Sequence, residues 1–498
     1  MSDLEKQEPD KRAGDMVAMA PFWRQVSTIL GGTAAMRDAG TAYLPQFPDE
    51  SLARYETRRK AAKFTNVFRD IVENLAQRPF SSPVTIADGT AGDQIASFVD
   101  NVDGAGNNLH VFAGEAFFQA ISYGVDWILV DYTRDVPPGA TVAEEVALGA
   151  RPYWVRYGAQ SVLAAYSDII DGQEQFVHVR LREPSVTRDG FEEKSVERIR
   201  VLERPKIRPG KYGPAQFQLW EEVDRDNGRE WAVVDEGQIS IGVIPIVPVL
   251  TGRRVGSSWR IHPPMQDAAD LQIELYQQES ALKHAKTMTA FPMLAGNGVT
   301  PPMGDNGKPA PTPVGPHAVL FAPEGSWQFI EPGATALKFL ADDIKETILQ
   351  LRELGRQPLT AQSGNLTVIT TAFAAEKGNS AIQAWALNLK DALERALDFT
   401  AKWLKVDDDP TVQIDTDFEL AGAADTYQHV LALRSTGEIS REAAIHEAKR
   451  RQILDAEYDG MEDLEAILGE IEGADGETGP LDMAGGGIAP AAPGGNAQ

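Results

Sequence analysis

The sequence predicts a mixed α+β fold that is mainly α, and three observations carry this prediction. Between residues 150 and 250 apolar and polar side chains alternate, which predicts β-strands. Apolar residues recur at steps of three and four over 265–289, 334–354 and 373–404, which predicts long amphipathic helices. The 498 residues are 43% hydrophobic and 8% aromatic, so ordinary cores can form and chain-wide disorder is excluded. At roughly 150 residues per domain, the length indicates about three folding units.

The N-terminal part is predicted to be helical after a polar start. We expect residues 1–20 to be disordered because they look polar and frayed. From 21 to 77 the apolar residues follow a helical period, and Asp49 or Ser51 is suited to cap a helix there. A further helix is predicted over 109–123.

The strand region contains recognisable turns. The dipeptides Asp-Gly at 189–190 and Asn-Gly at 227–228 are typical of tight hairpins. A short apolar run at 127–131 predicts one more strand. Residues 244–249 predict an edge strand or an extended crossing, because the two prolines in that run cannot donate to a ladder.

A segment rich in proline and glycine, residues 291–332, separates two of the predicted helices. It holds β-like pieces at 319–321 and 327–330. A segment of about forty residues between two helices is a small irregular module rather than a turn. Gly355 is suited to end the second of these helices.

The helix predicted over 334–354 has two distinct faces. Its apolar seam is formed by Leu337, Leu340, Ile344, Ile348 and Leu351. A basic stripe is formed by Lys338, Lys345, Arg352 and Arg356. Steps of seven and four almost return to the same azimuth, so the four basic side chains lie on nearly one side of the helix.

The C-terminal part is predicted to be a strand, helices and then a tail. Alternation at 411–418 predicts the strand, and Ser440 is suited to start a helix within the helical region 424–471. Residues 472–498 are rich in glycine, alanine and proline, so we expect a disordered tail.

The charge of the chain is strongly acidic and unevenly distributed. The formal net charge is -26 and the pI is about 4.7. From residue 406 to the end there are 21 acidic residues against 5 basic ones. Such acidity disfavours sequence-specific reading of nucleic acid. It indicates either solubility or a surface that must not adhere to a polyanion.

Composition also excludes several kinds of chemistry. Cysteine is absent, which excludes disulfides, thiolate metal sites and a cysteine nucleophile. No run of about 18 apolar residues exists, so we expect no membrane-spanning helix. The charged start has no apolar stretch of the kind that signal peptides need.

Catalytic and metal motifs are not found in the sequence. The glycines at 304–309 have the wrong spacing for a phosphate loop. Neither G-x-S-x-G nor H-E-x-x-H occurs, and the seven histidines lack metal-ligand spacing. Three aspartates at 407–409 lack the glycine and distal glutamate of a calcium loop and indicate a solvated turn. We therefore predict no catalytic residues, no metal and no cofactor.

The order of several short pieces resembles the portal proteins of tailed bacteriophages, the ring at the head–tail vertex. The pieces are YLP at 43–45, GVDWILVD at 124–131, RPYW at 151–154, PPMQDAADL at 263–271, FIEPGA at 329–334 and GEISRE at 437–442. They fall in the order and spacing of that family over about four-fifths of the chain.

The resemblance implies a portal-like division of the chain. Its parts would be a disordered N-terminus at 1–20, an α/β wing at 21–260, a first stem helix at 261–290, a small α/β clip at 291–332, a second stem helix at 333–355, a tunnel loop at 356–372, a long helix at 373–405, a helical crown at 406–471 and the disordered tail at 472–498.

The resemblance also implies a function without catalysis. Such proteins form a homo-dodecameric ring at the capsid vertex, a channel for packaging and ejecting double-stranded DNA. The ring contacts capsid protein and is a docking platform for terminase and for head-completion, adaptor or tail proteins. The implied location is the virion, with the host cytoplasm during assembly, and no membrane partner is implied.

The resemblance makes two groups of residues candidates for contact with DNA in the channel. They are the basic stripe of Lys338, Lys345, Arg352 and Arg356, and the loop residues Gln357, Gln362, Asn365 and Thr367. The stripe could instead pair with Asp342 and Glu346 or form salt bridges between subunits. The loop could simply be a mobile connection.

Three other interpretations remain open on the sequence. The chain could be a multi-helix globular protein with one insertion, a different oligomeric virion or scaffold protein, or a soluble hydrolase with an unrecognised site. If the portal interpretation holds, the acid excess suits a conduit that avoids adhesion to DNA.

Overall fold

The computed structural model has the predicted mixed α+β fold, with more helix than strand. It describes residues 8–133, 144, 148–225, 228–289, 293–299, 325–330, 334–354, 368–416, 423–450, 454, 458 and 463. These fall in two compact units, Met1–Phe418 and Glu419–Gln498, and each unit is described by itself.

The first unit begins with a series of helices. They are α1 (Gly14–Leu30), α2 (Gly32–Asp38), η1 (Gly40–Ala42), α3 (Leu52–Ala61), α4 (Val67–Gln77) and η2 (Arg78–Phe80). Ser51 caps α3 as predicted, since its side chain accepts a hydrogen bond from the backbone N–H of Arg54. The other predicted cap, Asp49, instead has a left-handed backbone with φ of 61°.

The predicted disorder of residues 1–20 is wrong from Gly14 onward. Helix α1 starts there, and Met16 and Met19 are buried with Trp23 in the core. Burial of these large apolar side chains against the rest of the unit stabilises a segment that looks polar by composition.

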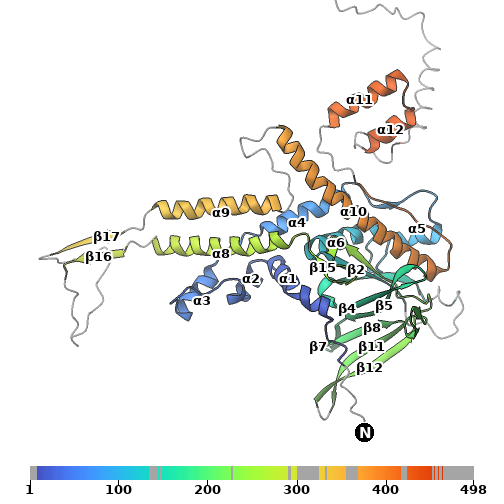
Figure 1. The fold of residues 1–498 in the computed structure, drawn as a ribbon, viewed down its shortest axis with the longest axis horizontal. Helices are drawn as coiled ribbons and strands as arrows, with labels where there is room; N and C mark the ends of the chain where they lie inside the picture. The colour runs from blue at the N-terminus through green and yellow to red at the C-terminus, as the bar shows by residue number, and fades with distance from the viewer. Residues whose placement is uncertain are drawn as a thin grey trace, which may run out of the picture. The chain divides into compact units, whose positions relative to one another are not determined.

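Two antiparallel sheets follow (Figure 1). The three-stranded sheet has the order β13-β2-β3, with β13 at Ile246–Leu250, β2 at Val125–Tyr132 and β3 at Pro152–Gly158. The five-stranded sheet has the order β12-β11-β8-β5-β4, with strands at Gly228–Gln238, Gln216–Arg225, Arg198–Glu203, Gln173–Arg182 and Val162–Ile170. The proline-containing strand β13 lies at an edge, as predicted.

Short two-stranded sheets complete the β structure. They pair β6 (Ser185–Asp189) with β7 (Glu192–Val196), β9 (Lys206–Arg208) with β10 (Lys211–Tyr212), β14 (Arg253–Arg254) with β15 (Ile261–His262), and β1 (Thr85–Ile86) with β18 (Val412–Gln413). The predicted Asp-Gly turn joins β6 to β7. The predicted strand at 411–418 is shorter than expected within its described residues, 411–416, because only two residues there find a partner strand.

Helices α5 (Asp93–Val99), α6 (Leu109–Tyr123) and α10 (Val368–Leu404) pack on the three-stranded sheet, and η3 (Ala159–Ser161) follows β3. The indole N–H of Trp154 donates to Thr400 Oγ1 at 2.9 Å and fixes α10 to β3. Helix α10 begins five residues before the predicted start at Phe373. The sequence there, VITT, is β-branched and has low helix propensity, which the long helix overrides.

The two helices flanking the proline- and glycine-rich segment form as predicted. Helix α8 spans Gln266–Thr289 and α9 spans Ala334–Leu354, and they lie side by side (Figure 1). Between them in sequence, β16 (Met293–Asn297) and β17 (Ser326–Ile330) form an antiparallel pair. The predicted β-like piece at 319–321 lies outside the described residues.

The second unit contains α11 (Ala423–Thr436) and α12 (Arg441–Arg450). Ser440 caps α12 as predicted, because its Oγ accepts from the backbone N–H of Ala443 at 3.0 Å. The predicted tail at 472–498 lies outside the described residues.

Candidate functional site

The feature that the sequence singles out is the helical pair of α8 and α9. The strand register shows how the pair is joined: Met293, four residues after α8, pairs with Ile330, four residues before α9. The two helices therefore run antiparallel, and their ends Thr289 and Ala334 lie at about the same level.

Buried polar side chains hold the inner face of α8. Glu279 is 5% exposed, and it accepts hydrogen bonds from Lys63 Nζ at 2.8 Å, from the backbone N–H of Thr65 at 2.8 Å and from Thr65 Oγ1 at 2.6 Å. Gln272 accepts from the backbone N–H of Phe68 at 2.8 Å and donates to the carbonyl of Thr65 at 3.0 Å. These contacts fasten α8 to the start of α4.

The sequence reasoning missed this polar face. Its signal was present, because Gln272 and Glu279 are seven residues apart and share a face with Leu275 and Leu282. Polar residues that recur on an apolar face indicate buried partners, since an unpaired buried polar group is costly.

The apolar seam of α9 is confirmed in its described part. Leu351 is fully buried, and Ile344 and Ile348 pack against the core. The remaining seam residues, Leu337 and Leu340, are half-buried. One face of α9 is thus covered by the rest of the chain.

The basic stripe lies on a more exposed side of α9. Lys338 is exposed, Lys345 Nζ lies 2.9 Å from Asp342 Oδ1, and Arg352 Nη2 lies 2.9 Å from Asp70 Oδ2 on α4. The pKa of Asp342 is lowered by the hydrogen bond from Lys345, then by the positive charges of Lys345 and Lys338. Lys345 therefore pairs with Asp342, one of the two predicted partners on the same helix, whereas Arg352 pairs with a residue of another helix that was not predicted.

The structure places Lys338, Lys345 and Arg352 together on one helix. The other candidate DNA-contact residues are not among the residues that it describes; they are Arg356, Gln357, Gln362, Asn365 and Thr367.

Apolar side chains are also exposed on α9. Phe339 exposes 71% of its surface and Leu349 exposes 52%. Both side chains are large and apolar, so they are available for a contact with another protein.

A cavity of about 600 Å³ lies between α4, α6 and β3. Its titratable lining residues are Glu73, His110, Glu115 and Arg156, and no serine or threonine lines it. His110 Nδ1 accepts from the backbone N–H of Val84 at 3.2 Å. This histidine therefore has no hydroxyl nucleophile in the cavity to activate.

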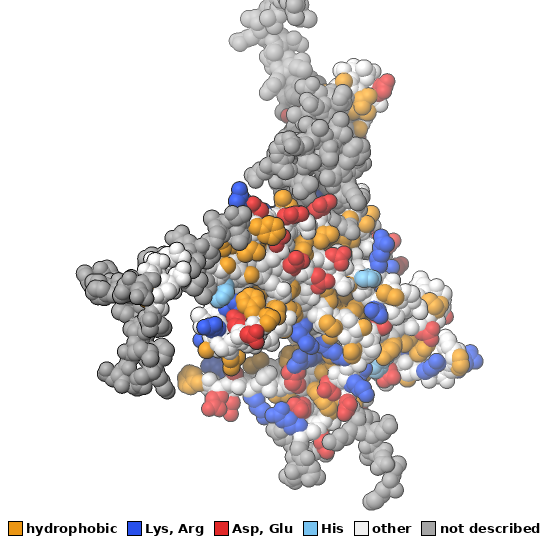
Figure 2. Space-filling model, turned by 60° about the vertical axis from the view of Figure 1, so that its left-hand side comes forward, with side chains coloured by type: hydrophobic (Ala, Val, Ile, Leu, Met, Phe, Trp, Pro, Cys, Tyr) orange, Lys and Arg blue, Asp and Glu red, His pale blue; other side chains and the backbone are white. Residues whose placement is uncertain are grey.

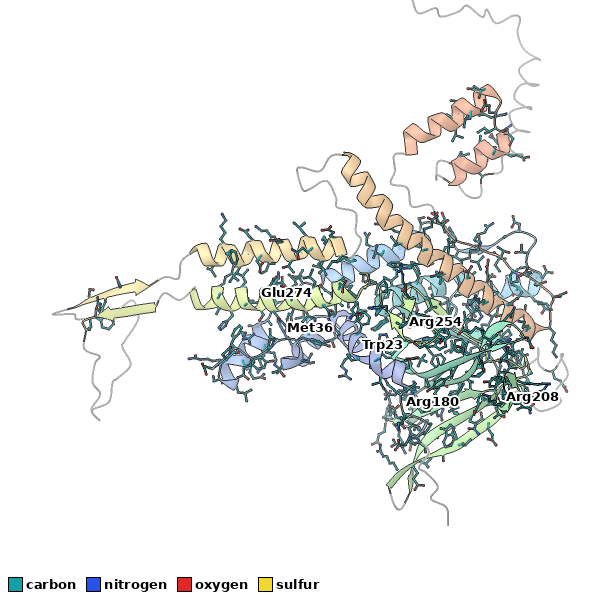
Figure 3. The ribbon with its side chains drawn as sticks, viewed as in Figure 1. Trp23, Met36, Arg180, Arg208, Arg254 and Glu274 are labelled. Carbon is teal, nitrogen blue, oxygen red and sulfur yellow. The ribbon has the colours of Figure 1, made fainter. Side chains whose placement is uncertain are left out.

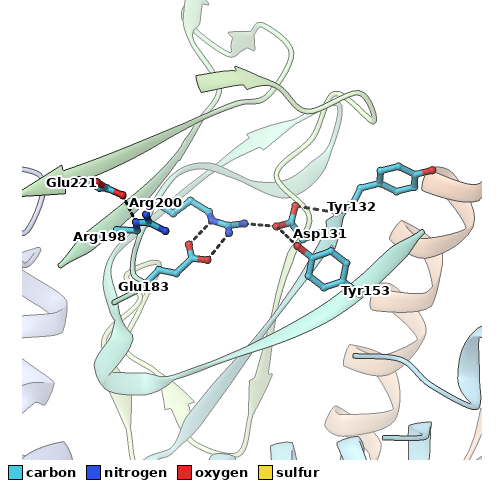
Figure 4. Close-up of polar contacts among 7 residues, drawn as sticks. All are labelled: Asp131, Tyr132, Tyr153, Glu183, Arg198, Arg200 and Glu221. Atoms are coloured by element: carbon cyan, nitrogen blue, oxygen red, sulfur yellow. Dashed lines mark hydrogen bonds and ion pairs between the residues drawn. The ribbon is translucent and has the colours of Figure 1, made fainter. Parts of the chain in front are cut away.

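A second polar cluster joins the two sheets (Figure 4). Arg200 on β8 forms two hydrogen bonds of 2.7 Å with Glu183 and an ion pair with Asp131 on β2. Burial by itself would lower the pKa of the Arg200 guanidinium, but Tyr157, Asp131 and Glu183 outweigh burial and raise it. The cluster pairs opposite charges, so we interpret it as a structural link.

Metal and membrane features are not found among the described residues. No group of three or more histidine or acidic side chains there could hold a metal ion. Asp408, from the aspartate run, accepts from the backbone N–H of Gly92 at 2.9 Å at the start of α5. Among the helices in the described ranges, none is both long and apolar enough to cross a bilayer.

Three comparisons relate this chain to known proteins. Residues 264–404, less than a third of the chain, match the family described as Domain of unknown function (DUF4055). This match contains the helical pair and α10. No curated protein matches the sequence.

Two solved structures are similar to the chain at low identity. One is the neck of a native GTA particle computed with C12 symmetry: identity is 14%, TM-score is 0.39, and the match covers 85% of this chain and 99% of that chain. The other is the neck of an empty GTA particle computed with C6 symmetry: identity is 13%, TM-score is 0.41, and coverage is 83% and 99%.

Proposed function

We propose that this protein is a structural, non-catalytic subunit of a phage-like particle and that it assembles into a ring. The observation that carries the proposal is the helical pair, one face of which is covered by the chain while its outer side exposes Phe339, Leu349 and charges of both signs. A helix of this kind is suited to pack against a neighbouring copy.

A ring is an assembly in which the helical pair of every copy can make the same contact with the next copy. In a cyclic assembly each copy offers one face to the next copy and a different face to the previous one. The helical pair and the ordered pieces that resemble portal proteins support this assembly.

In its finer form the proposal is a dodecameric portal at the capsid vertex. Double-stranded DNA would pass through its channel during packaging and ejection. Terminase, capsid protein and head-completion or adaptor proteins would bind the ring. The parts would be the wing at 21–260, stem helices at 261–290 and 333–355, the clip at 291–332, a tunnel loop from 356 to the start of α10 at Val368, the long helix from there to 405 and the crown at 406–471.

For DNA contact we favour Lys338, Arg356 and the segment after Arg356. Lys345 and Arg352 already have carboxylate partners, which weaken their pull on phosphate. Lys338 carries the remaining exposed charge of the described stripe. The other proposed contacts are Arg356, Gln357, Gln362, Asn365 and Thr367.

The acidity of the chain is consistent with DNA that slides. On the face that Figure 2 shows, acidic and basic side chains are interspersed over the described surface. Tight binding to the DNA backbone needs many lysine and arginine contacts with phosphate. A conduit with a net charge of -26 would hold DNA weakly.

Electron microscopy of the purified chain tests the proposal. We expect a closed ring of about twelve copies with a central channel. A closed assembly without a channel would favour a different scaffold protein. A chain that stays monomeric in every condition would overturn the proposal and return attention to a hydrolase.

A further inference from the structure

The outer side of α8 carries an acidic stripe. It consists of Asp267, Asp270 and Glu274, which are all exposed (Figure 3 labels Glu274). Spacings of three and four place them on one side of the helix. Glu274 follows Gln272 by two residues, about 200° around the helix, so the stripe faces away from the buried polar face.

The acidic stripe has no cationic partner among the described residues. Asp270 Oδ1 accepts from the amide of Gln25 at 2.9 Å, and Glu274 Oε1 accepts from the amide of Gln278 at 3.3 Å. Both partners are neutral. The acidic stripe is therefore suited to a cationic group of another copy.

The basic stripe lies on the other flank of the helical pair. Arg352 reaches Asp70 on α4, and the inner face of α8 is fastened to the segment that starts α4. The basic stripe thus runs along the side of the pair that carries α4. The acidic stripe runs along the side turned away from α4. One copy offers opposite charges on its two flanks, and a head-to-tail contact joins two different surfaces of neighbouring copies.

The two stripes also match in height along the pair. At 1.5 Å per residue, Glu274 lies about 22 Å and Asp270 about 28 Å from the end of α8 at Thr289. On the same scale Lys345 lies about 16 Å and Arg352 about 27 Å from the start of α9 at Ala334. Because Thr289 and Ala334 are level, Asp270 and Glu274 fall within about one helical turn of Arg352 and Lys345.

We infer that the acidic stripe of α8 in one copy docks against Lys345 and Arg352 of α9 in the next copy. The inference rests on the proposed ring with the helical pair running along the ring axis, because neighbours related by a rotation have no offset along that axis. Arg352 can serve Asp70 and a neighbour together, because a guanidinium carries five N–H donors. Its intrachain pair then orients it for the contact.

Charge reversal with mutual rescue tests the contact. One variant carries Asp270→Lys and Glu274→Lys, a second carries Lys345→Glu and Arg352→Glu, and a third carries all four. The control is the exposed Glu192→Lys of β7 together with Glu193→Lys, which makes the same charge change elsewhere. Ring formation is measured by analytical ultracentrifugation over protein and salt concentration.

We expect each two-site reversal to raise the concentration for half-assembly by about tenfold at low salt, because like charges then face each other. The four-site variant should regain most of the wild-type value, and the control should not differ from wild type. The effect should shrink as salt rises.

The outcomes separate this inference from the proposed function. If wild type forms rings and the two-site reversal variants assemble normally, the stripe contact is wrong and the proposed ring stands. The same holds if wild type forms rings and the four-site variant shows no rescue. A wild-type chain that never assembles overturns both. The α8 variant alters only exposed residues, so circular dichroism should show a folded chain.

Discussion

Asp126 on β2 is fully buried, and its Oδ2 lies 3.4 Å from Nε of Arg156 on β3. The distance is longer than that of a strong charge-assisted hydrogen bond. Burial raises the pKa of Asp126 to about 7, against the lowering effect of Arg156. Glu115 on α6 forms an ion pair with the same arginine, with 3.2 Å between Glu115 Oε2 and Arg156 Nη1.

We predict that Asp126 makes the stability of the chain depend on pH. The folded chain binds the proton below about pH 7, and the unfolded chain binds it only below about pH 4. The contribution of Asp126 is therefore full below about pH 4 and is lost as pH rises through about 7. Replacing Asp126 with asparagine should remove this dependence of stability on pH, which amounts to at most about 4 kcal/mol in the free energy of unfolding.

Urea unfolding at pH 5 and pH 8 measures the effect. The stability of the asparagine variant relative to wild type should be higher at pH 8 than at pH 5. The control Asp189→Asn alters an exposed turn carboxylate, and its stability relative to wild type should be the same at pH 5 and pH 8. Parallel pH profiles for wild type and the Asp126 variant would contradict the prediction.

Glu279 should contribute strongly to the stability of the helical pair. Glu279→Ala leaves the backbone N–H and hydroxyl of Thr65 without their acceptor in a buried site. We expect a loss of about 2–4 kcal/mol in the free energy of unfolding. Thermal unfolding should show a much smaller change for Glu353→Ala, which removes an exposed carboxylate from α9. Similar losses for the two variants would mean that the buried contacts are weak.

Arg200 should be harder to replace than a surface arginine with the same geometry. Arg200→Leu leaves Asp131 and Glu183 beside each other without their cation, and we expect a loss of about 3–5 kcal/mol. Arg182 also forms a two-bond pair, with Glu197, but both side chains are substantially exposed. Arg182→Leu should cost less than about 1 kcal/mol. Equal costs in chemical unfolding would show that burial of the Arg200 cluster adds nothing.

The helical pair could be predicted because its signals are local. The apolar period of α9 and the dense prolines and glycines after α8 lie within short windows of sequence. The start of α1 could not be predicted, because Met16 and Met19 are stabilised by segments far along the chain. The shortness of β18 likewise depends on its distant partner β1.

The candidate site was predictable in position but not in its contacts. The azimuth of Lys338, Lys345 and Arg352 follows from helix geometry alone. The Arg352–Asp70 pair joins residues on separate helices, so no local pattern could predict it. The same holds for Glu279 and Lys63, which only the packing of α8 on the N-terminal segment brings together.

Gly124 should tolerate alanine less well than Gly190, although both have positive φ. Gly124 ends α6 with φ of 87°, and a Cβ there would lie 3.2 Å from the Cα of Pro263. Gly190 has φ of 61° in the β6–β7 turn, with no atom within 4 Å of such a Cβ. Gly190→Ala should cost about 1 kcal/mol from backbone strain alone. Gly124→Ala should cost about 1–2 kcal/mol more, because the backbone before α8 must shift. Urea unfolding of the two variants checks the difference, and equal costs would show that the close approach to Pro263 is easily relieved.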